Sequence, residues 1–235
     1  MSARQLADRG AADLLFNDRP NDPTYWQIAG GHLNEEQAQR VVEAARELAD
    51  TVPMRIEQQP ALNISQIAAR ARKHKTRLER DGKTLALLVV DHLGLIIPGT
   101  IYRGNRTNEI GEITAALKAL AKELNVALVA LCQLNRGVET RDNKRPGLSD
   151  LRDSGTIEQD ADVILFAYRE EYYLANAKSN DKAEEDRRIA RLFEVRNRLE
   201  LILAKNRNGP TDIIDLFFSA AHNAARDLER QEHGR

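Results

Sequence analysis

Residues 84–91 read TLALLVVD and limit the folds that this chain can adopt. This is a continuous apolar run that ends in a carboxylate, and a run without alternation is typical of a parallel strand covered on both faces. A basic loop follows, then a helix over about 108–125, then a second apolar run at 126–132. The apolar stripe of the helix consists of Ile110, Ile113, Leu117, Leu120 and Leu124. Strand, helix and strand form a right-handed βαβ unit, so the sequence predicts an α/β fold with a mostly parallel sheet.

The rest of the chain predicts elements on both sides of this unit. Helical spacing indicates helices over residues 2–16, 34–50 and 63–80. The residues of the second helix expected to face inward are Val41, Val42, Ala45 and Leu48. β-favouring runs predict strands at residues 54–57, 163–166, 199–204 and 212–218.

Three segments have less regular patterns. Tyr25, Trp26 and Ile28 predict a short helical or extended piece that buries an aromatic anchor. Residues 176–191 are highly charged, which indicates an exposed loop or a helical insertion. Residues 219–235 predict a polar helical tail that frays or is disordered.

Composition excludes several classes of protein. The chain has 235 residues, of which 42% are hydrophobic and 30% charged, as expected for a globular protein with ample core. Its formal net charge is −1, so binding to nucleic acid must depend on local basic patches. The single cysteine, Cys132, excludes an intramolecular disulfide and is expected to be a buried small hydrophobe. The absence of an apolar signal region or a membrane-spanning run predicts a cytoplasmic protein without a membrane partner.

Asp91 is the first candidate site residue. A carboxylate at the end of a buried strand is the pattern of a Walker B strand, in which the acid holds the water shell of a nucleotide-bound Mg²⁺. The alternative is an acid that caps the next helix.

The tripeptide Gly82-Lys83-Thr84 looks like the end of a phosphate-binding P-loop. That loop requires the pattern G-x-x-x-x-G-K-[ST] between a strand and a helix. Position 77 is arginine here, and the tripeptide lies between a helix and a strand. We therefore interpret it as a connecting turn.

The segment after residue 132 is polar and rich in arginine. Gln133 lies at the carboxyl end of a predicted strand, where open α/β sheets bind ligands. The cations of the loop that follows suit contact with phosphates: Arg136, Arg141, Lys144, Arg145 and Arg152. The alternative is an ordinary solvated loop, and for the later segment 205–210, KNRNGP, a cationic hairpin turn.

Several motifs agree in order and spacing with one family. They are LLVVD at 87–91, LKALAKELN at 117–125, LCQLNR at 131–136, KRP at 144–146, SDLRDSG at 149–155, IEQDAD at 157–162 and KNRNGP at 205–210. Together they resemble the ATPase domain of the DnaB-type replicative DNA helicases, over roughly residues 1–218. The resemblance implies a RecA-like fold, a homo-hexameric ring, ATP with Mg²⁺, and 5′ to 3′ translocation along single-stranded DNA.

The resemblance also implies roles in catalysis and nucleotide binding. Asp91 resembles the Walker B acid that holds Mg²⁺ through water, and Gln133 resembles the residue that senses the γ-phosphate. Lys205 and Arg207 resemble the pair that reaches the nucleotide of the neighbouring subunit, with Arg207 as the arginine finger. A planar guanidinium suits that role because it neutralises charge on the transferring phosphoryl group.

Other residues resemble the DNA-binding elements of the family. Arg152, Asp153 and Gly155 resemble the loop that follows the DNA backbone, where glycine lets main-chain N–H groups approach phosphates closely. The family usually has glutamate at the position of Asp153. The remaining candidates for DNA contact are Arg103, Arg106, Arg136 and Arg145.

The chain departs from the family at its beginning. Residues 1–3 resemble the segment just after the catalytic glutamate, so that base, the P-loop and the helical collar domain would all precede residue 1. Residues 1–218 are therefore expected to form a partial RecA-like domain that does not hydrolyse ATP by itself.

Three readings remain open from the sequence. The chain is part of a replicative helicase, with a primase and a helicase loader as further partners. It is alternatively a non-catalytic module that binds single-stranded DNA or interferes with an intact helicase. A recombinase of the RecA–RadA group shares the fold but is not expected to carry the block at 149–162.

Overall fold

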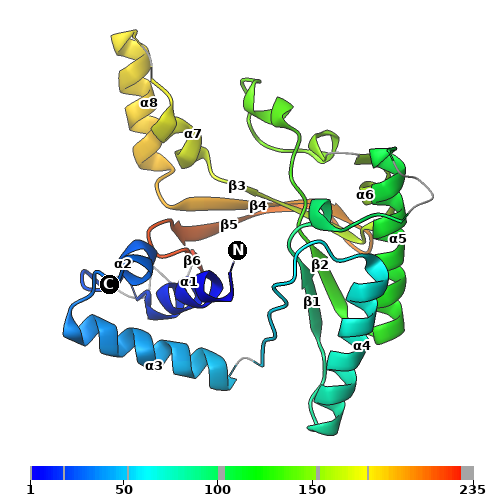
Figure 1. Ribbon diagram of the computed structural model, residues 1–235. Helices are drawn as coiled ribbons and strands as arrows, with labels where there is room; N and C mark the ends of the chain where they lie inside the picture. Colours follow the sequence, from blue (N-terminus) through cyan, green and yellow to red (C-terminus); the bar gives the residue numbers. More distant parts are fainter. Residues whose placement is uncertain are drawn as a thin grey trace. The chain divides into compact units, whose positions relative to one another are not determined.

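The computed structural model describes residues 2–17, 19–51, 53–99, 104–151, 154–178 and 180–228. The chain divides into two compact units (Figure 1). The first consists of residues 1–58, 167–202 and 213–235, and the second of residues 59–166 and 203–212. All of the candidate site residues belong to the second unit.

The first unit begins with three helices. They are α1 (Ala3–Leu15), α2 (Tyr25–Gly30) and α3 (Glu35–Thr51). Ser2 and Thr24 each accept a hydrogen bond from a first-turn backbone N–H, which fixes where α1 and α2 start. The small apolar core between the helices consists of Ala11, Ala12, Tyr25, Ile28 and Ala44. This unit also contains α7 (Glu170–Asn176), α8 (Lys182–Glu194) and β6 (Ala224–Asp227).

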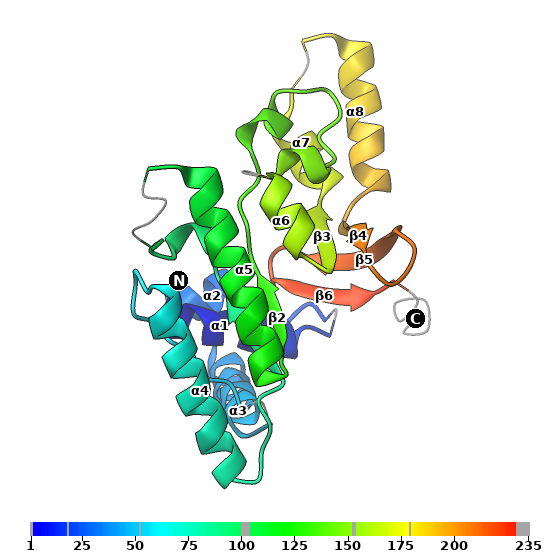
Figure 2. The same cartoon turned by 90° about the vertical axis from the view of Figure 1, so that its right-hand side faces the viewer.

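The second unit is the predicted βαβ region. It contains α4 (Ile64–Arg80), β1 (Leu87–Val90), α5 (Arg106–Leu124), β2 (Ala127–Ala130) and α6 (Ser154–Asp160). Short 3₁₀ turns are η1 (Leu93–Leu95), η2 (Arg136–Glu139) and η3 (Leu148–Asp150). Figure 2 shows α4 and α5 side by side along the small sheet. Ala68 and Ala71 of α4 pack with Leu120 and Leu124 of α5, against Leu88 of β1.

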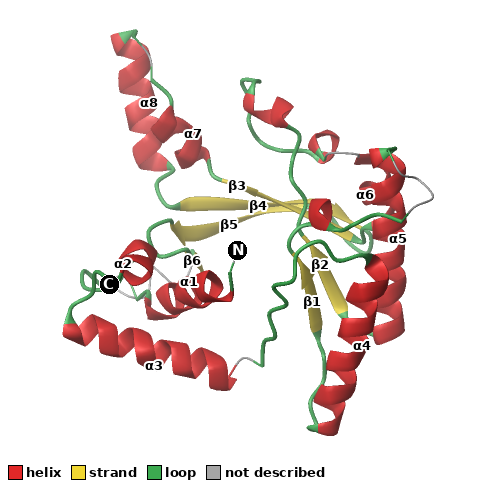
Figure 3. Ribbon diagram, in the orientation of Figure 1, coloured by secondary structure: helices red, strands yellow, loops and turns green. Residues whose placement is uncertain are grey.

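The strands form two sheets (Figure 3). β1 and β2 pair in parallel, with Leu87 opposite Ala127 and Val90 opposite Ala130. The other sheet has the order β3-β4-β5-β6, with β3 (Val163–Tyr168), β4 (Arg198–Asn206) and β5 (Asp212–Ser219). β5 and β6 are antiparallel. The parallel βαβ unit is confirmed, and an antiparallel pair accompanies it.

The structure corrects several expectations. No strand forms at residues 54–57, all of which the structure describes, and residues 224–227 form β6 in place of a helix. Tyr25 is the buried aromatic anchor, whereas Trp26 is 74% exposed. In α3 the buried residue is Ala44, while Val42 and Ala45 are exposed. Cys132 is only partly buried.

The sequence predicts that β1 is covered on both faces, but in the structure one face is exposed. Leu87 and Val89 are 49% and 52% exposed, whereas Leu88 packs in the core with α4 and α5. Val129 on β2 and Val163 on β3 are likewise exposed. Among the described residues, helices therefore cover one face of the β1–β2 pair.

Candidate nucleotide and nucleic-acid site

The carboxyl ends of β1 and β2 lie side by side. Leu131 donates its backbone N–H to the carbonyl of Val90 at 2.9 Å, and Leu93 donates to the carbonyl of Leu131 at 3.0 Å. These bonds continue the parallel pairing beyond both strands. Asp91 directly follows β1 and Gln133 lies three residues after β2, so the structure places both at one sheet edge.

His92 is a residue of this edge that the sequence analysis does not predict. Its Nδ1 accepts a hydrogen bond from the backbone N–H of Gly94 at 3.1 Å, and its Nε2 lies 3.5 Å from Nε2 of Gln133. His92 therefore lies beside the Gln133 amide, and its only signal in the sequence is its place next to Asp91.

Asp91 is the predicted ligand of a nucleotide-bound Mg²⁺. Its side chain is exposed, and the described residues contain no cluster of three or more metal-ligating side chains. Mg²⁺ commonly keeps several waters and binds one or two carboxylates together with substrate phosphates. Asp91 fits such an ion as a single protein ligand, but the described residues do not form an all-protein cage.

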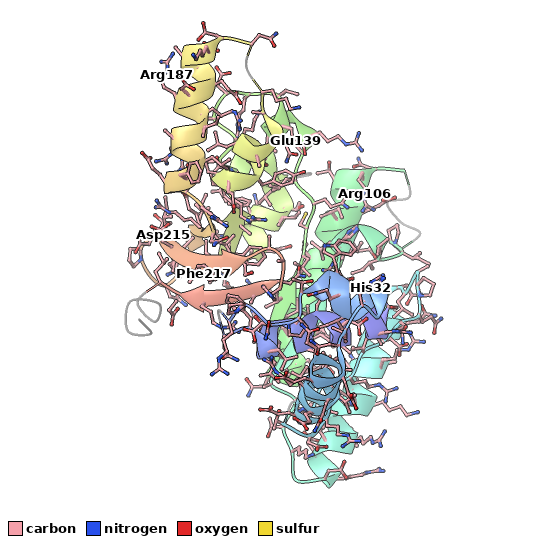
Figure 4. All side chains as sticks on the ribbon, turned by 90° about the vertical axis from the view of Figure 1, so that its left-hand side faces the viewer. His32, Arg106, Glu139, Arg187, Asp215 and Phe217 are labelled. Carbon is pink, nitrogen blue, oxygen red and sulfur yellow. The ribbon has the colours of Figure 1, made fainter. Side chains whose placement is uncertain are left out.

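Two basic candidates lie on loops that leave the same edge. Arg106 is the first residue of α5, and Figure 4 shows it at the start of that helix. Its guanidinium lies 3.4 Å from the carbonyl of Gly94, in the loop after Asp91, and 3.4 Å from Glu109. Arg136 begins η2, three residues after Gln133, and its side chain is exposed. Arg103 lies outside the described residues.

Two cations of the loop from 137 to 150 form hydrogen bonds within the loop. Arg141 binds the buried Asp150 through two hydrogen bonds of 3.0 and 2.6 Å and the carbonyl of Arg145 at 2.7 Å. Lys144 binds the carbonyl of Glu139 at 2.8 Å. The loop itself accepts hydrogen bonds from Arg141 and Lys144, and their contact with phosphates stays a prediction. Arg145 is partly buried beside them.

The Arg141–Asp150 pair gives a pH-dependent prediction. Burial disfavours the charged Asp150, but hydrogen bonds from Arg141 and from the backbone of Gly147 outweigh it, so the pKa of Asp150 lies below its usual 3.8. A lowered folded-state pKa contributes stability that is present above the unfolded pKa and is lost as pH falls through the folded pKa. We expect Asp150→Asn to lower the thermal midpoint near neutral pH, and the decrease to shrink as the pH falls below about 3.8 and through the folded-state pKa, measured by circular dichroism over a pH series. A decrease of the same size at every pH would contradict the charge-based explanation.

The helix α6 is fixed to α5 by polar contacts. Thr114 donates to Asp160 at 2.5 Å, and Lys118 donates to the carbonyl of Asp160 at 2.6 Å. Gly155 lies in the first turn of α6, and nothing lies within 4 Å of the place where its Cβ would be. That open space agrees with a close approach of a ligand to the backbone. Arg152 and Asp153 lie outside the described residues.

Lys205 and Arg207 lie at the carboxyl end of α6. Lys205 donates to the carbonyl of Glu158, and Arg207 donates to the carbonyl of Gln159 at 3.0 Å. The guanidinium of Arg207 also lies 3.1 Å from Asp162 and is 49% exposed. Cations suit the partial negative charge of a helix end, so this contact stabilises the isolated chain.

Asp162 contacts both Lys118 of α5 and Arg207. The hydrogen bond from Lys118, 2.8 Å long, holds the pKa of Asp162 below its usual value, burial opposes this effect, and the charges of Lys118, Arg207 and Lys122 add to it. Asp162 therefore stays ionised near neutral pH as a partner of Arg207. The structure thus makes two groups, Asp91 with Gln133 and Lys205 with Arg207. Among the described side chains, no hydrogen bond or ion pair joins one group to the other.

Comparisons with known proteins show the family of this chain. The model of the DnaB-like helicase C terminal domain matches residues 1–227. The replicative DNA helicase DnaB of Rickettsia typhi (strain ATCC VR-144 / Wilmington) is 44% identical over 232 residues, which are 98% of this chain and 44% of that protein. The replicative DNA helicase DnaC of Bacillus subtilis (strain 168) is 38% identical over 201 residues, 86% of this chain and 39% of that protein.

Solved structures show the same fold. A DnaB-like replicative helicase, solved in a study of its interactions with primase, has a TM-score of 0.78 at 30% identity, covering 97% of this chain and 50% of that one. A solved ATPase domain has a TM-score of 0.79 at 30% identity, covering 97% of this chain and 72% of that one. The RecA-like fold is therefore confirmed.

The chain spans less than half the length of these curated relatives, 44% and 39%. Within the described part, no helix combines the length and the apolar character needed to cross a membrane. From its sequence match and its fold, this chain belongs to the family of DnaB-like helicase C-terminal domains.

Proposed function

We propose that this chain is part of an ATP-dependent replicative DNA helicase that unwinds duplex DNA by moving 5′ to 3′ along single-stranded DNA as a homo-hexameric ring. The observation that carries the proposal is the shared edge of β1 and β2. Asp91 and Gln133 lie there, and the loops that leave it carry Arg106 and Arg136. The two residues expected to contact the nucleotide and the two cations expected to contact the DNA backbone therefore belong to the loops at one edge of the sheet.

In this proposal the side chains have separate tasks. Asp91 would hold Mg²⁺ through water, and ATP with Mg²⁺ would supply the phosphoryl group for transfer. Gln133 would report the state of the γ-phosphate to the η2 loop. Lys205 and Arg207 would contact the nucleotide of the next subunit. Residues 1–235 lack the G-x-x-x-x-G-K-[ST] pattern, so we expect them to bind ATP weakly without a P-loop from elsewhere.

The remaining features of the proposal follow from the family. Arg145, Arg152, Asp153 and Gly155, with Arg103, would complete the DNA contacts. Primase and a helicase loader are proposed partners, and one related structure concerns interactions with primase. We expect the protein to work in the cytoplasm. The family match favours this proposal over a recombinase.

DNA binding by the isolated chain tests the proposed phosphate contacts of Arg106 and Arg136 directly. We expect Arg106→Gln with Arg136→Gln to lower the salt slope of binding to an oligothymidylate of about 20 nucleotides by about 1.4, because each lost phosphate contact removes about 0.7 from the slope. Fluorescence anisotropy over a salt series measures it. The matched control is Arg46→Gln with Arg55→Gln, which removes the same charge from exposed sites elsewhere. Equal slopes for the parent and the edge variant would reject these contacts.

A second candidate function is a non-catalytic module that binds single-stranded DNA or inserts into the ring of an intact helicase. The observation that favours it is the arginine-rich segment 136–152, which suits contact with phosphates. Adding the chain to an intact related helicase and measuring its unwinding of DNA distinguishes the two functions. Stimulated or unchanged unwinding supports the helicase proposal, and inhibition that depends on Arg207 supports the non-catalytic module.

A further inference from the structure

The outer face of α4 carries a stripe of cations that the proposed function does not use. Lys73, Arg77 and Arg80 occupy positions i, i+4 and i+7, so they follow one side of the helix. All three side chains are exposed. The other side of α4 is apolar, and Ala68 and Ala71 pack there against α5. Figure 2 shows α4 at the border of this unit, with α5 as its neighbour.

These three cations differ from the other basic residues of the helix. Arg72 forms a paired hydrogen bond with Glu123 at 2.6 and 2.7 Å, and Lys75 donates to the carbonyl of Leu124 at 2.8 Å. Within the described ranges, Lys73, Arg77 and Arg80 form no side-chain hydrogen bond or ion pair. Their charges are therefore available to a ligand.

The spacing of the stripe matches a phosphate backbone. An α-helix rises 1.5 Å per residue, so Lys73 and Arg80 lie about 10 Å apart along the axis. One strand of a DNA duplex presents a phosphate about every 3.4 Å of axis, so this length corresponds to about three phosphates. Three cations can therefore face three consecutive charges.

The lack of apolar neighbours favours nucleic acid over an acidic protein. The exposed large hydrophobic side chains of the described residues include none between Met54 and Leu87, the interval that contains α4. Protein interfaces are enriched in aromatic residues and depleted in lysine, whereas protein–DNA interfaces are polar and strongly positive. Three exposed cations without exposed large apolar neighbours fit a polyphosphate.

The stripe is distinct from the edge that carries Asp91. The chain turns after Arg80 and enters β1 at Leu87, so the end of α4 lies toward the amino end of β1. Asp91 and Gln133 lie at the opposite, carboxyl end. A strand of this length separates the two ends by about 13 Å.

We propose that Lys73, Arg77 and Arg80 form a second nucleic-acid surface, which binds the phosphates of duplex DNA without reading its sequence. The surface needs neither nucleotide nor the loops at the edge of β1 and β2. This proposal goes beyond the proposed function, and its test is independent of the binding of single strands by Arg106 and Arg136.

The test compares two variants of equal net charge. Lys73→Gln, Arg77→Gln and Arg80→Gln are combined in one chain, and Arg46→Gln, Arg55→Gln and Arg196→Gln in the control. Binding to a labelled duplex of about 20 base pairs is measured over a salt series. The stripe variant is expected to lower the slope of log K against log salt by about 2.7, since each lost duplex contact removes about 0.9. The control is expected to keep the parent slope.

Each outcome decides the proposal. An unchanged slope for the stripe variant, or an equal decrease for the control, overturns it. Arg77 and Arg80 also lie in the last turn of α4, so a merely structural role would lower the thermal midpoint and leave the slope intact. Binding of labelled poly-glutamate through the three cations, without duplex binding, assigns the surface to an acidic protein segment and also overturns it. Arg106→Gln with Arg136→Gln is expected to leave duplex binding by the stripe intact.

Discussion

Arg207→Ala is expected to lower ATP turnover about 10³-fold while nucleotide binding stays within a few-fold of the parent. The reason is that a guanidinium supplied by a neighbour stabilises charge that develops only in the transition state. The experiment uses a chimaera in which residues 1–227 replace the matching segment of the Rickettsia typhi relative. Steady-state hydrolysis and equilibrium binding of a labelled ATP analogue give the two quantities.

The control for Arg207 is Arg198, the first residue of β4, whereas Arg207 directly follows that strand. Arg198 pairs with Asp215 at 2.8 and 2.6 Å, so Arg198→Ala removes a β4 guanidinium without touching the proposed finger. We expect nearly full turnover from it. Arg207→Lys keeps the charge but not the planar fork, and turnover close to that of the alanine variant is expected. Near-normal hydrolysis by Arg207→Ala would refute the finger.

Asp91→Asn is expected to lower turnover by about 10²-fold or more and to raise the Mg²⁺ concentration needed for half-maximal activity. Asparagine has almost the size of aspartate but lacks the charge that holds a hydrated cation. Asp142→Asn is a suitable control, because Asp142 is exposed in the 137–150 loop. An unchanged Mg²⁺ dependence for Asp91→Asn would exclude the Walker B role.

Mixing the two defective chimaeras tests the trans arrangement. An Arg207→Ala subunit has an intact Asp91, and an Asp91→Asn subunit has an intact Arg207. If Arg207 acts on the nucleotide of a neighbour, mixed rings contain interfaces with both residues and recover part of the turnover. A finger that acts within its own subunit gives no recovery.

Local signals predicted the helices well. The helices predicted over 2–16 and 63–80 and the apolar stripe of α5 depend on residues close together in the sequence, and the structure confirms all three. The βαβ unit also follows from local order, since strand, helix and strand are consecutive. The failed strand at 54–57 shows the limit, because a short run forms a strand only where another strand pairs with it.

Long-range partners were not visible in the sequence. Which side of α3 faces inward depended on where α1 packs, and Ala44 took the place expected of its neighbours. The placement of Asp91 and Gln133 at strand ends was predictable from apolar runs. The use of Arg141 to hold Asp150, and the contact of Arg207 with a helix 48 positions earlier, required the fold.

The attachment of Lys205 and Arg207 to the end of α6 has a mechanical consequence. Both side chains donate hydrogen bonds to carbonyls at the carboxyl end of α6. The amino end of α6 directly follows the segment expected to contact DNA. If Arg207 moves to a phosphate of a neighbouring subunit, as proposed, α6 loses one of these two hydrogen bonds and keeps those from Thr114 and Lys118. In the proposed ring, the nucleotide bound at one subunit interface would then change how firmly α6 is held beside the segment expected to contact DNA, which would couple ATP hydrolysis to movement along the strand.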